Sequence, residues 1–169
     1  VSSNIVAVGQ GAKSLIAVSD FGKVFLIPES QLLAGGFATE SISEYQLPDK
    51  LASSIAGIVL KDGRLAAWCG SPEPAMWTIT TVGQLERKWN LPGIPQVPPV
   101  AIDVGVVFGL PGRLHVSGAQ GGVSVEDYRA AQDGANQRAW KSLVAVGNNH
   151  VLAVTDRDQL VRDEYREKP

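Results

Sequence analysis

Residues 14–27, SLIAVSDFGKVFLI, hold two short apolar segments on either side of the turn Asp20-Phe21-Gly22. The segments are rich in Val, Ile and Leu and are too short for helices. A turn of this composition favours a chain reversal, so the stretch predicts two antiparallel strands. The first segment has three counterparts further along the chain. They are RLAAWCG at 64–70, RLHVSGA at 113–119 and HVLAVTD at 150–156.

Each of these four segments stands between two other apolar runs. The preceding runs are NIVAVG at 4–9, SIAGIVL at 54–60, VAIDVGVVF at 100–108 and LVAVG at 143–147; the following runs are KVFLIP at 23–28, AMWTIT at 75–80, GVSVEDY at 122–128 and QLVRDEY at 159–165. The turn Lys61-Asp62-Gly63-Arg64 contains an Asp-Gly pair, which is typical of a type I′ hairpin. Three-stranded units that recur every ~40–50 residues have the length of propeller blades.

Outer strands are expected in the first two copies. EYQLP at 44–48 resembles KWNLP at 88–92, and Trp140 is expected to be the corresponding aromatic of the third copy. The segments that start at Ser124 and Gln159 also have the composition of short helices. Both align with KVFLIP, however, and we therefore predict strands there.

The sequence therefore predicts an all-β fold. We expect a single domain over residues 1–169, a propeller-like array of about four antiparallel blades with three to four strands each. The expected repeats cover approximately 4–48, 54–92, 100–140 and 142–169, and the last is incomplete. Because closed rings have ~4–8 blades, we expect an arc or half-ring. A β-sandwich is the alternative, since it too has short strands separated by turns, but the four-fold match of the segments argues against it.

The stretch at 14–27, with its D-x-G-x-V turn, resembles propellers of the pyrroloquinoline-quinone-like and WD40-like kinds. The aromatics Tyr45, Trp89 and Trp140 at the expected blade ends are part of this resemblance. The WD dipeptide and the repeated G-x-x-x-W motif of the quinone enzymes are absent from the sequence. The resemblance therefore implies an architecture and no active site.

Composition limits the function classes. The formal net charge of −2 gives no basic excess for a nucleic-acid backbone. No apolar run approaches the ~20 residues that cross a bilayer, so we expect neither nucleic acid nor a membrane as a partner. Cys69 is the single cysteine, which excludes an internal disulfide and a multi-cysteine metal cluster. The chain begins at Val1, which indicates a processed chain or a piece of a longer one, so no compartment is predicted.

No catalytic, cofactor-binding or metal site is predicted, and no cofactor is expected. His115 and His150 are the only histidines. Two histidines do not complete a tetrahedral zinc site, so both are expected to have structural roles.

The candidate binding residues are Trp68, Trp77 and Asp103. The two tryptophans flank a loop at 69–74, where exposed aromatic side chains could stack on a sugar or anchor a peptide. Asp103 is an acid inside the apolar run 100–108, and on an inner strand it could contact a ligand in the channel. The alternatives are packing of the tryptophans between blades and a hydrogen bond from Asp103 to a neighbouring blade.

The expected function is a non-catalytic binding or scaffolding module that mediates protein interaction. Its partner would be another protein or the remainder of its own chain, and two copies closing one ring as a homodimer are a further expectation. One alternative is a part of a quinone-dependent or other propeller enzyme whose active site is completed outside this chain. Another is a carbohydrate-binding propeller that uses the loop between Trp68 and Trp77.

Overall fold

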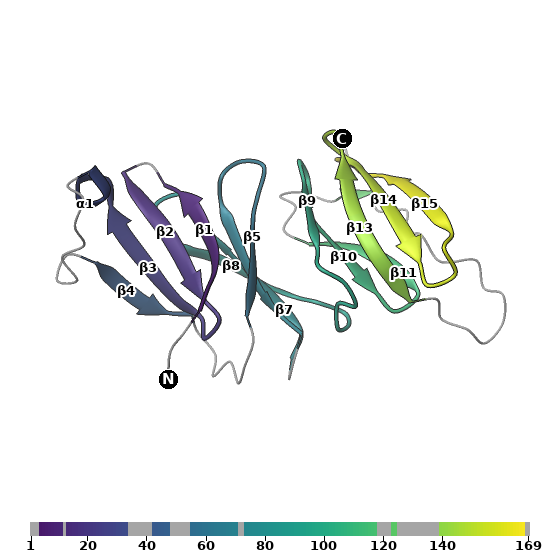
Figure 1. Cartoon of the computed structure of the whole chain (residues 1–169), viewed down its shortest axis with the longest axis horizontal. Coiled ribbons are helices and arrows are strands. Elements are labelled where there is room, and N and C mark those ends of the chain that lie inside the picture. Colours follow the sequence, from purple (N-terminus) through teal and green to yellow (C-terminus); the bar gives the residue numbers. More distant parts are fainter. Residues whose placement is uncertain are drawn as a thin grey trace. The chain divides into compact units, whose positions relative to one another are not determined.

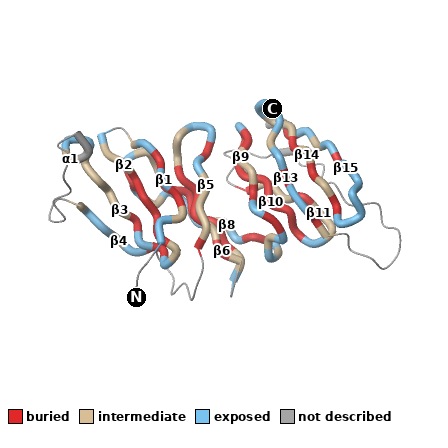
Figure 2. Tube along the Cα trace, viewed as in Figure 1, coloured by how far each residue is buried: buried red, intermediate tan, exposed pale blue. Residues whose placement is uncertain are grey.

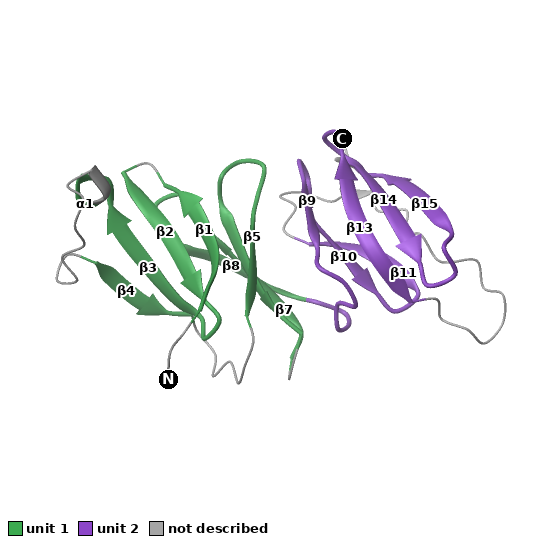
Figure 3. Ribbon diagram, viewed as in Figure 1, with its two compact units in different colours: residues 1–90 green, residues 91–169 purple. Residues whose placement is uncertain are grey.

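A computed structural model describes residues 4–11, 13–33, 42–47, 55–70, 73–117, 123–124 and 139–167. The chain divides into two compact units, Val1–Asn90 and Leu91–Pro169 (Figure 3). No helix among the described residues is long and apolar enough to cross a membrane.

The first unit contains two antiparallel four-stranded sheets (Figure 1). The first sheet has the order β1 (Ile5–Gln10), β2 (Ser14–Ser19), β3 (Lys23–Pro28) and β4 (Ser43–Gln46), and the short helix α1 (Glu29–Leu33) follows β3. The second sheet has the order β5 (Ala56–Val59), β6 (Leu65–Cys69), β7 (Ala75–Ile79) and β8 (Leu85–Asn90). In both sheets the strands are neighbours in the order in which the chain supplies them. The predicted strands at 4–9, 14–20, 23–28 and 44–48 are confirmed within the described residues, as are their counterparts in the second copy.

Glycine turns set the hairpins of the first unit. Leu60 N donates to Arg64 O at 2.8 Å, and the intervening turn places Gly63 at φ 84°. The hairpin expected at this Asp-Gly pair is confirmed, but its turn differs from the expected type I′. Asp62 does not have a positive φ, and the loop has three residues with glycine in the left-handed position, which is the next most common hairpin geometry. Asp62 Oδ1 instead accepts a hydrogen bond from Arg64 N at 3.0 Å.

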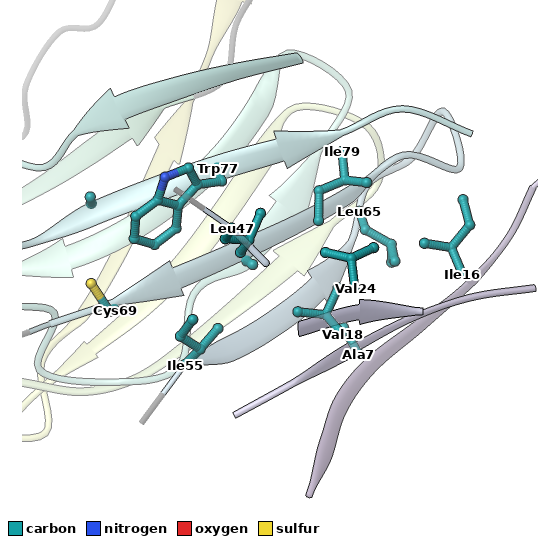
Figure 4. Close-up of a cluster of buried hydrophobic side chains, with 12 residues drawn as sticks. Ala7, Ile16, Val18, Val24, Leu47, Ile55, Leu65, Cys69, Trp77 and Ile79 are labelled. Atoms are coloured by element: carbon teal, nitrogen blue, oxygen red, sulfur yellow. The ribbon is translucent and has the colours of Figure 1, made fainter. Parts of the chain in front are cut away.

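The core of the first unit lies between its two sheets. Because side chains alternate along a strand, one face of each sheet supplies the core residues. The two sheets approach each other closely at two glycines. A Cβ added to Gly57 would collide with Ala7, and a Cβ added to Gly9 would collide with Leu65. Figure 4 shows this cluster, whose buried members are Ala7, Ile16, Val18, Val24, Leu47, Ile55, Leu65, Ala67, Cys69, Ala75, Trp77 and Ile79.

The second unit contains two antiparallel three-stranded sheets and one strand pair. The third sheet has the order β9 (Val100–Ile102), β10 (Gly105–Leu110) and β11 (Arg113–Ser117). The fourth sheet has the order β13 (Trp140–Val146), β14 (His150–Thr155) and β15 (Leu160–Glu164). β12 (Val123–Ser124) pairs with β16 (Arg166–Glu167). The strand expected from Gln159 is confirmed, whereas most of the segment from Ser124 lies outside the described residues.

The third copy departs from the expected strand order. The run 100–108 was expected to be one strand, and it is two: Ile102 pairs with Gly105 across a turn at Asp103 and Val104. Gly105 has φ 148°, which a residue with a side chain rarely adopts, and this glycine allows the chain to reverse inside an apolar run. As a result 113–117 is the third strand of its sheet, although its sequence resembles the second strands of the other copies.

Trp140 also differs from its expected place. It was expected in an outer strand of the third copy, and it begins β13, the first strand of the fourth sheet. Its indole N–H donates to Leu110 O at 2.8 Å and to Arg113 O at 3.0 Å, so it ties the β10–β11 turn to the next sheet. Trp140 belongs to the core of the second unit. The buried members of that core are Val97, Ile102, Val104, Val107, Leu114, Trp140, Leu143, Val151, Ala153, Val161 and Tyr165.

Candidate binding surfaces

The two candidate tryptophans lie on opposite faces of the second sheet. Trp77 pairs with Ala67, and Trp68 pairs with Met76, so adjacent positions of β6 and β7 place their rings on different sides. Trp77 is fully buried in the core of the first unit, and its indole N–H has no hydrogen-bond partner among the described residues. Trp68 is half-buried. The two rings therefore do not form one stacking surface, and a ligand contact by either ring stays a prediction.

Asp103 lies in the tight turn between β9 and β10, where it is exposed. Its backbone N–H donates to Asn148 O at 2.9 Å, in the turn between β13 and β14. The backbone of Asp103 thus joins two neighbouring sheets of the second unit. The carboxylate belongs to a turn and not to the middle of a strand, and its role in binding a ligand stays a prediction.

The histidines have partners within their own sheets. His115 Nε2 lies 3.0 Å from Ser117 Oγ on β11, and His150 Nε2 lies 3.6 Å from Glu164 Oε2 across β14 and β15. Among the described residues no group of three or more His, Cys, Asp or Glu side chains could hold a metal ion. The first contact is a hydrogen bond within one strand that places an imidazole beside the buried hydroxyl of Ser117, and the second is a cross-strand pair.

A groove of about 420 Å³ opens at one end of the first unit, within the size range of ligand sites. The β1–β2 turn, the end of β3 and the β7–β8 turn form its walls. Lys13 is exposed at this groove, and Val82 is 54% exposed. The lining residues are Lys13, Ser14, Leu26, Pro28, Ser43, Thr81 and Val82.

Tyr45 fixes one wall of this groove. Its hydroxyl donates to Gly83 O, so β4 of the first sheet holds the β7–β8 turn of the second. Burial of the half-buried phenol raises the pKa of Tyr45 to about 12. A Cβ on Gly83 would collide with Leu26, which shows how closely this turn approaches β3. The groove offers hydroxyls, a cation and apolar walls, which suit binding and supply no acid–base pair.

The first sheet also carries an apolar face that does not belong to the core. Val8 pairs with Ala17, Ala17 with Phe25, and Leu15 with Ile27, so these five side chains share the face opposite the core. We call them the first-sheet face. Val8 is 46% exposed, Leu15, Phe25 and Ile27 are half-buried, and Ala17 is buried, although none of the five belongs to the buried cluster between the sheets. Lys23 Nζ and Glu44 Oε1, which lie 3.4 Å apart, form its charged margin.

The fourth sheet carries a matching face on the side away from its core. Val144 pairs with Leu152, and Val154 pairs with Leu160, while the alternate residues of these strands enter the core. Val144, Val146 and Leu160 are 55%, 45% and 68% exposed. Figure 2 shows exposed positions along β13 and β15. We call Val144, Val146, Leu152, Val154 and Leu160 the fourth-sheet face.

Comparisons with known proteins identify a solved structure of similar fold but no family. No protein-family model and no curated protein sequence matches the chain. The selenomethionine-substituted virginiamycin B lyase from Staphylococcus aureus matches with a TM-score of 0.50 and 16% identity, over 97% of this chain and 56% of the lyase chain. A catalytically inactive variant of that lyase, solved with quinupristin, matches with a TM-score of 0.40 and 19% identity, over 96% of this chain and 59% of the other.

The fold is propeller-like. The lyase is a propeller-fold protein, and the four antiparallel sheets of three to four strands confirm the predicted fold class. At 16% identity the likeness concerns the fold alone. The chain spans little more than half the length of the lyase. The finer resemblance to quinone-type or WD40 propellers stays a prediction.

Neither the two apolar faces nor the groove was predicted from the sequence. Exposed valines such as Val8 and Val144 look like core residues in an apolar run, because a single sequence does not say which side of a strand is covered. The register of the β13–β14 hairpin supplies that information. Because Leu143 and Val151 face the core, the side chain of Val144 faces away from the core.

Proposed function

We propose that this chain is a non-catalytic binding and scaffolding module of the propeller type, and that it mediates protein interaction. The observation that carries the proposal is the apolar character of the two outer sheet faces. On the first-sheet face Val8 is exposed and three further apolar side chains are half-buried, with Lys23 and Glu44 at the margin. On the fourth-sheet face Val144, Val146 and Leu160 are exposed, with Arg162 on the outer strand. An apolar centre with a polar margin is the usual composition of a protein interface.

The energetics favour a protein as the ligand of these faces. Full burial of a Val or Leu side chain contributes about 1.5–3 kcal/mol, and contiguous exposed apolar patches mark interaction sites. Val144, Val146 and Leu160 are about half exposed or more, so a covering protein surface would remove much of their apolar area from water. A sheet face is flat and wide, which suits another sheet or a broad protein surface better than a small molecule.

Nothing in the described residues favours the two alternative functions. A carbohydrate site built from Trp68 and Trp77 would need both rings on one surface, and they lie on opposite faces of the sheet. The similarity to the lyase is a similarity of fold at 16% identity, and it does not favour an enzymatic role for this chain. Fold alone is a poor guide to activity, since one architecture hosts many chemistries.

Site-specific photocrosslinking tests the proposal. A photoreactive benzoylphenylalanine replaces Val8 or Val144 in cells that make the protein, and Ile94, 58% exposed and outside both faces, is the matched control position. We expect crosslinked peptides of an identified protein from positions 8 and 144, and none of that protein from position 94. Absence of crosslinks from both faces, or equal crosslinking from position 94, would overturn the proposal.

A further inference from the structure

We propose that the groove at the end of the first unit binds a small organic acid, with its carboxylate on Lys13 and its apolar body between β3 and the β7–β8 turn. The ligand class is a monocarboxylate that carries an aliphatic or aryl group. This site goes beyond the proposed function, because none of the residues that line the groove belongs to the first-sheet face or to the fourth-sheet face.

The groove continues the core that lies between the two sheets of the first unit. Ser14 pairs with Pro28, and Leu26 pairs with Ser43. Because paired residues share a face and side chains alternate along a strand, all four lie on the face that carries the core residue Ile16. Leu26 itself packs against that core. The groove therefore has an apolar wall that leads out of the core and ends among hydroxyl groups.

Close packing of two turns holds the opposite wall in place. A Cβ on Gly11 would collide with Thr81 O, so the β1–β2 turn lies against the β7–β8 turn. The β7–β8 turn is closed by a hydrogen bond from Gly83 N to Thr80 O at 2.8 Å, and the hydroxyl of Tyr45 donates to Gly83 O. The walls are thus formed in the chain without a ligand, which lowers the cost of ordering them on binding.

Lys13 supplies the charge that selects an anion. Its side chain is exposed and forms no ion pair with the residues that the structure describes. Glu44, next to the lining residue Ser43, pairs with Lys23 Nζ at 3.4 Å. The backbone N–H of Glu29, at the start of α1, donates to Lys13 O at 3.1 Å, but its carboxylate forms no ion pair with Lys13. Among the described residues no carboxylate lines the groove, so the ammonium of Lys13 is the charge that a ligand meets there.

The polar groups of the groove favour a carboxylate over other ligands. Ser14, Ser43 and Thr81 each bring a hydroxyl, and none of these side chains forms a hydrogen bond with a described residue. A carboxylate accepts charge-assisted hydrogen bonds from an ammonium and further hydrogen bonds from hydroxyls. A metal ion would need carboxylate or imidazole ligands, which the described lining residues do not include. The volume of about 420 Å³ lies near the lower end of the range of ligand sites, which fits a small molecule.

Titration followed by two-dimensional amide NMR of the isotope-labelled chain tests the proposal, with octanoate as the probe and octanamide as its neutral match. We expect saturable shifts of the amide signals of Ser14, Thr81 and Val82, with a dissociation constant in the millimolar range for a ligand of this size. Octanamide should bind about 5- to 10-fold more weakly, because it lacks the charge that pairs with Lys13. Equal affinity of the two probes, or no saturable shifts at these residues, would overturn the proposal.

Lys13→Met separates the contribution of the cation from that of the apolar walls. Methionine keeps an unbranched apolar side chain and removes the ammonium, so octanoate should bind this variant as weakly as octanamide does. Lys141→Met is the matched control, because Lys141 belongs to the second unit and does not line the groove. Circular dichroism verifies that both variants are folded. Unchanged octanoate binding by Lys13→Met, or an equal loss in Lys141→Met, contradicts the role of Lys13.

Val82→Ser tests the apolar wall. Val82 is 54% exposed, so the substitution should leave the fold intact, and it should weaken the binding of both octanoate and octanamide by about 3-fold. Val59→Ser is the control, because Val59 is 45% exposed in the same unit and does not line the groove. If Val82→Ser binds both probes like the unaltered chain, the apolar body does not lie in the groove and the proposal fails.

Two sources supply this ligand chemistry, a free organic acid and the carboxyl terminus of a peptide. N-acetyl-leucyl-leucine represents the peptide, and octanoate represents the free acid. We expect octanoate to bind more tightly, because the narrow groove has room for one apolar chain and offers no free strand edge to a peptide backbone among its described lining residues. Tighter binding of the peptide, lost in Lys13→Met, would overturn the free acid as the ligand.

Discussion

At the scale of single residues, Trp140 shows how one side chain couples two sheets. Its indole N–H donates hydrogen bonds to Leu110 O at 2.8 Å and to Arg113 O at 3.0 Å, and its ring belongs to the core of the second unit. Trp140→Phe keeps most of the ring and leaves both carbonyls without this donor. We expect a loss of about 1–3 kcal/mol in the free energy of unfolding, measured by urea denaturation with far-ultraviolet circular dichroism.

Trp89→Phe is the matched control, because the Trp89 indole N–H has no hydrogen-bond partner among the described residues. This control should lose clearly less stability than Trp140→Phe. Equal losses in the two variants would show that the shared donor of Trp140 does not contribute.

Tyr45 provides a prediction on pH dependence. Burial raises its pKa from 10.0 to about 12, so the unfolded chain loses this proton first as the pH rises. The contribution of Tyr45 to stability is therefore complete below pH 10 and declines as the pH rises from 10 to about 12. The difference in phenolate absorbance between the unaltered chain and Tyr45→Phe isolates this group. We expect a midpoint near 12, and a midpoint near 10 would contradict the described burial.

At the scale of elements, the approach of β1 to β5 depends on one missing side chain. A Cβ on Gly57 would collide with the Cβ of Ala7 and would lie 3.3 Å from its Cα. Gly57→Ala should therefore destabilise the first unit by about 1–3 kcal/mol, measured by thermal and urea unfolding. The second substitution Ala7→Gly should restore part of this loss, because it removes the colliding atom.

Gly93→Ala is the control for Gly57→Ala. A Cβ at position 93 meets its nearest neighbours at 3.9 Å, an ordinary contact distance. A cost at Gly93 as large as that at Gly57, or no recovery in the double variant, would argue against close packing of β1 on β5.

The elements with a local sequence pattern were predicted correctly. The strands β1 to β3 and β5 to β7 follow from apolar runs and turns, because hairpins are set by neighbouring residues, whereas β4 and β8 follow from the similarity of EYQLP to KWNLP. The prediction was wrong at 100–108, where Gly105 allows a reversal inside an apolar run. The sequence of 113–117 resembles those of the second strands, yet it forms the third strand of its sheet. A short apolar segment after a turn has the same sequence pattern whichever position in the sheet its strand takes.

The candidate site was less predictable than the fold. Trp68 and Trp77 stand close together in the sequence, yet the register of β6 and β7 turns them to opposite faces. Asp103 looked like a buried acid and is an exposed turn residue. The exposure of Val8 and Val144 depends on which sheets are stacked, and that information is absent from any single strand.

At the scale of the whole molecule, the proposed function requires that the first-sheet face and the fourth-sheet face bind protein. Photocrosslinking from position 144, with position 94 as the control, measures this binding. We expect crosslinked peptides of one identified protein from position 144 and none of that protein from position 94, because Val144 is 55% exposed on the fourth-sheet face and Ile94 lies on neither face. Equal crosslinking from the two positions, or none from position 144, would contradict the proposed function.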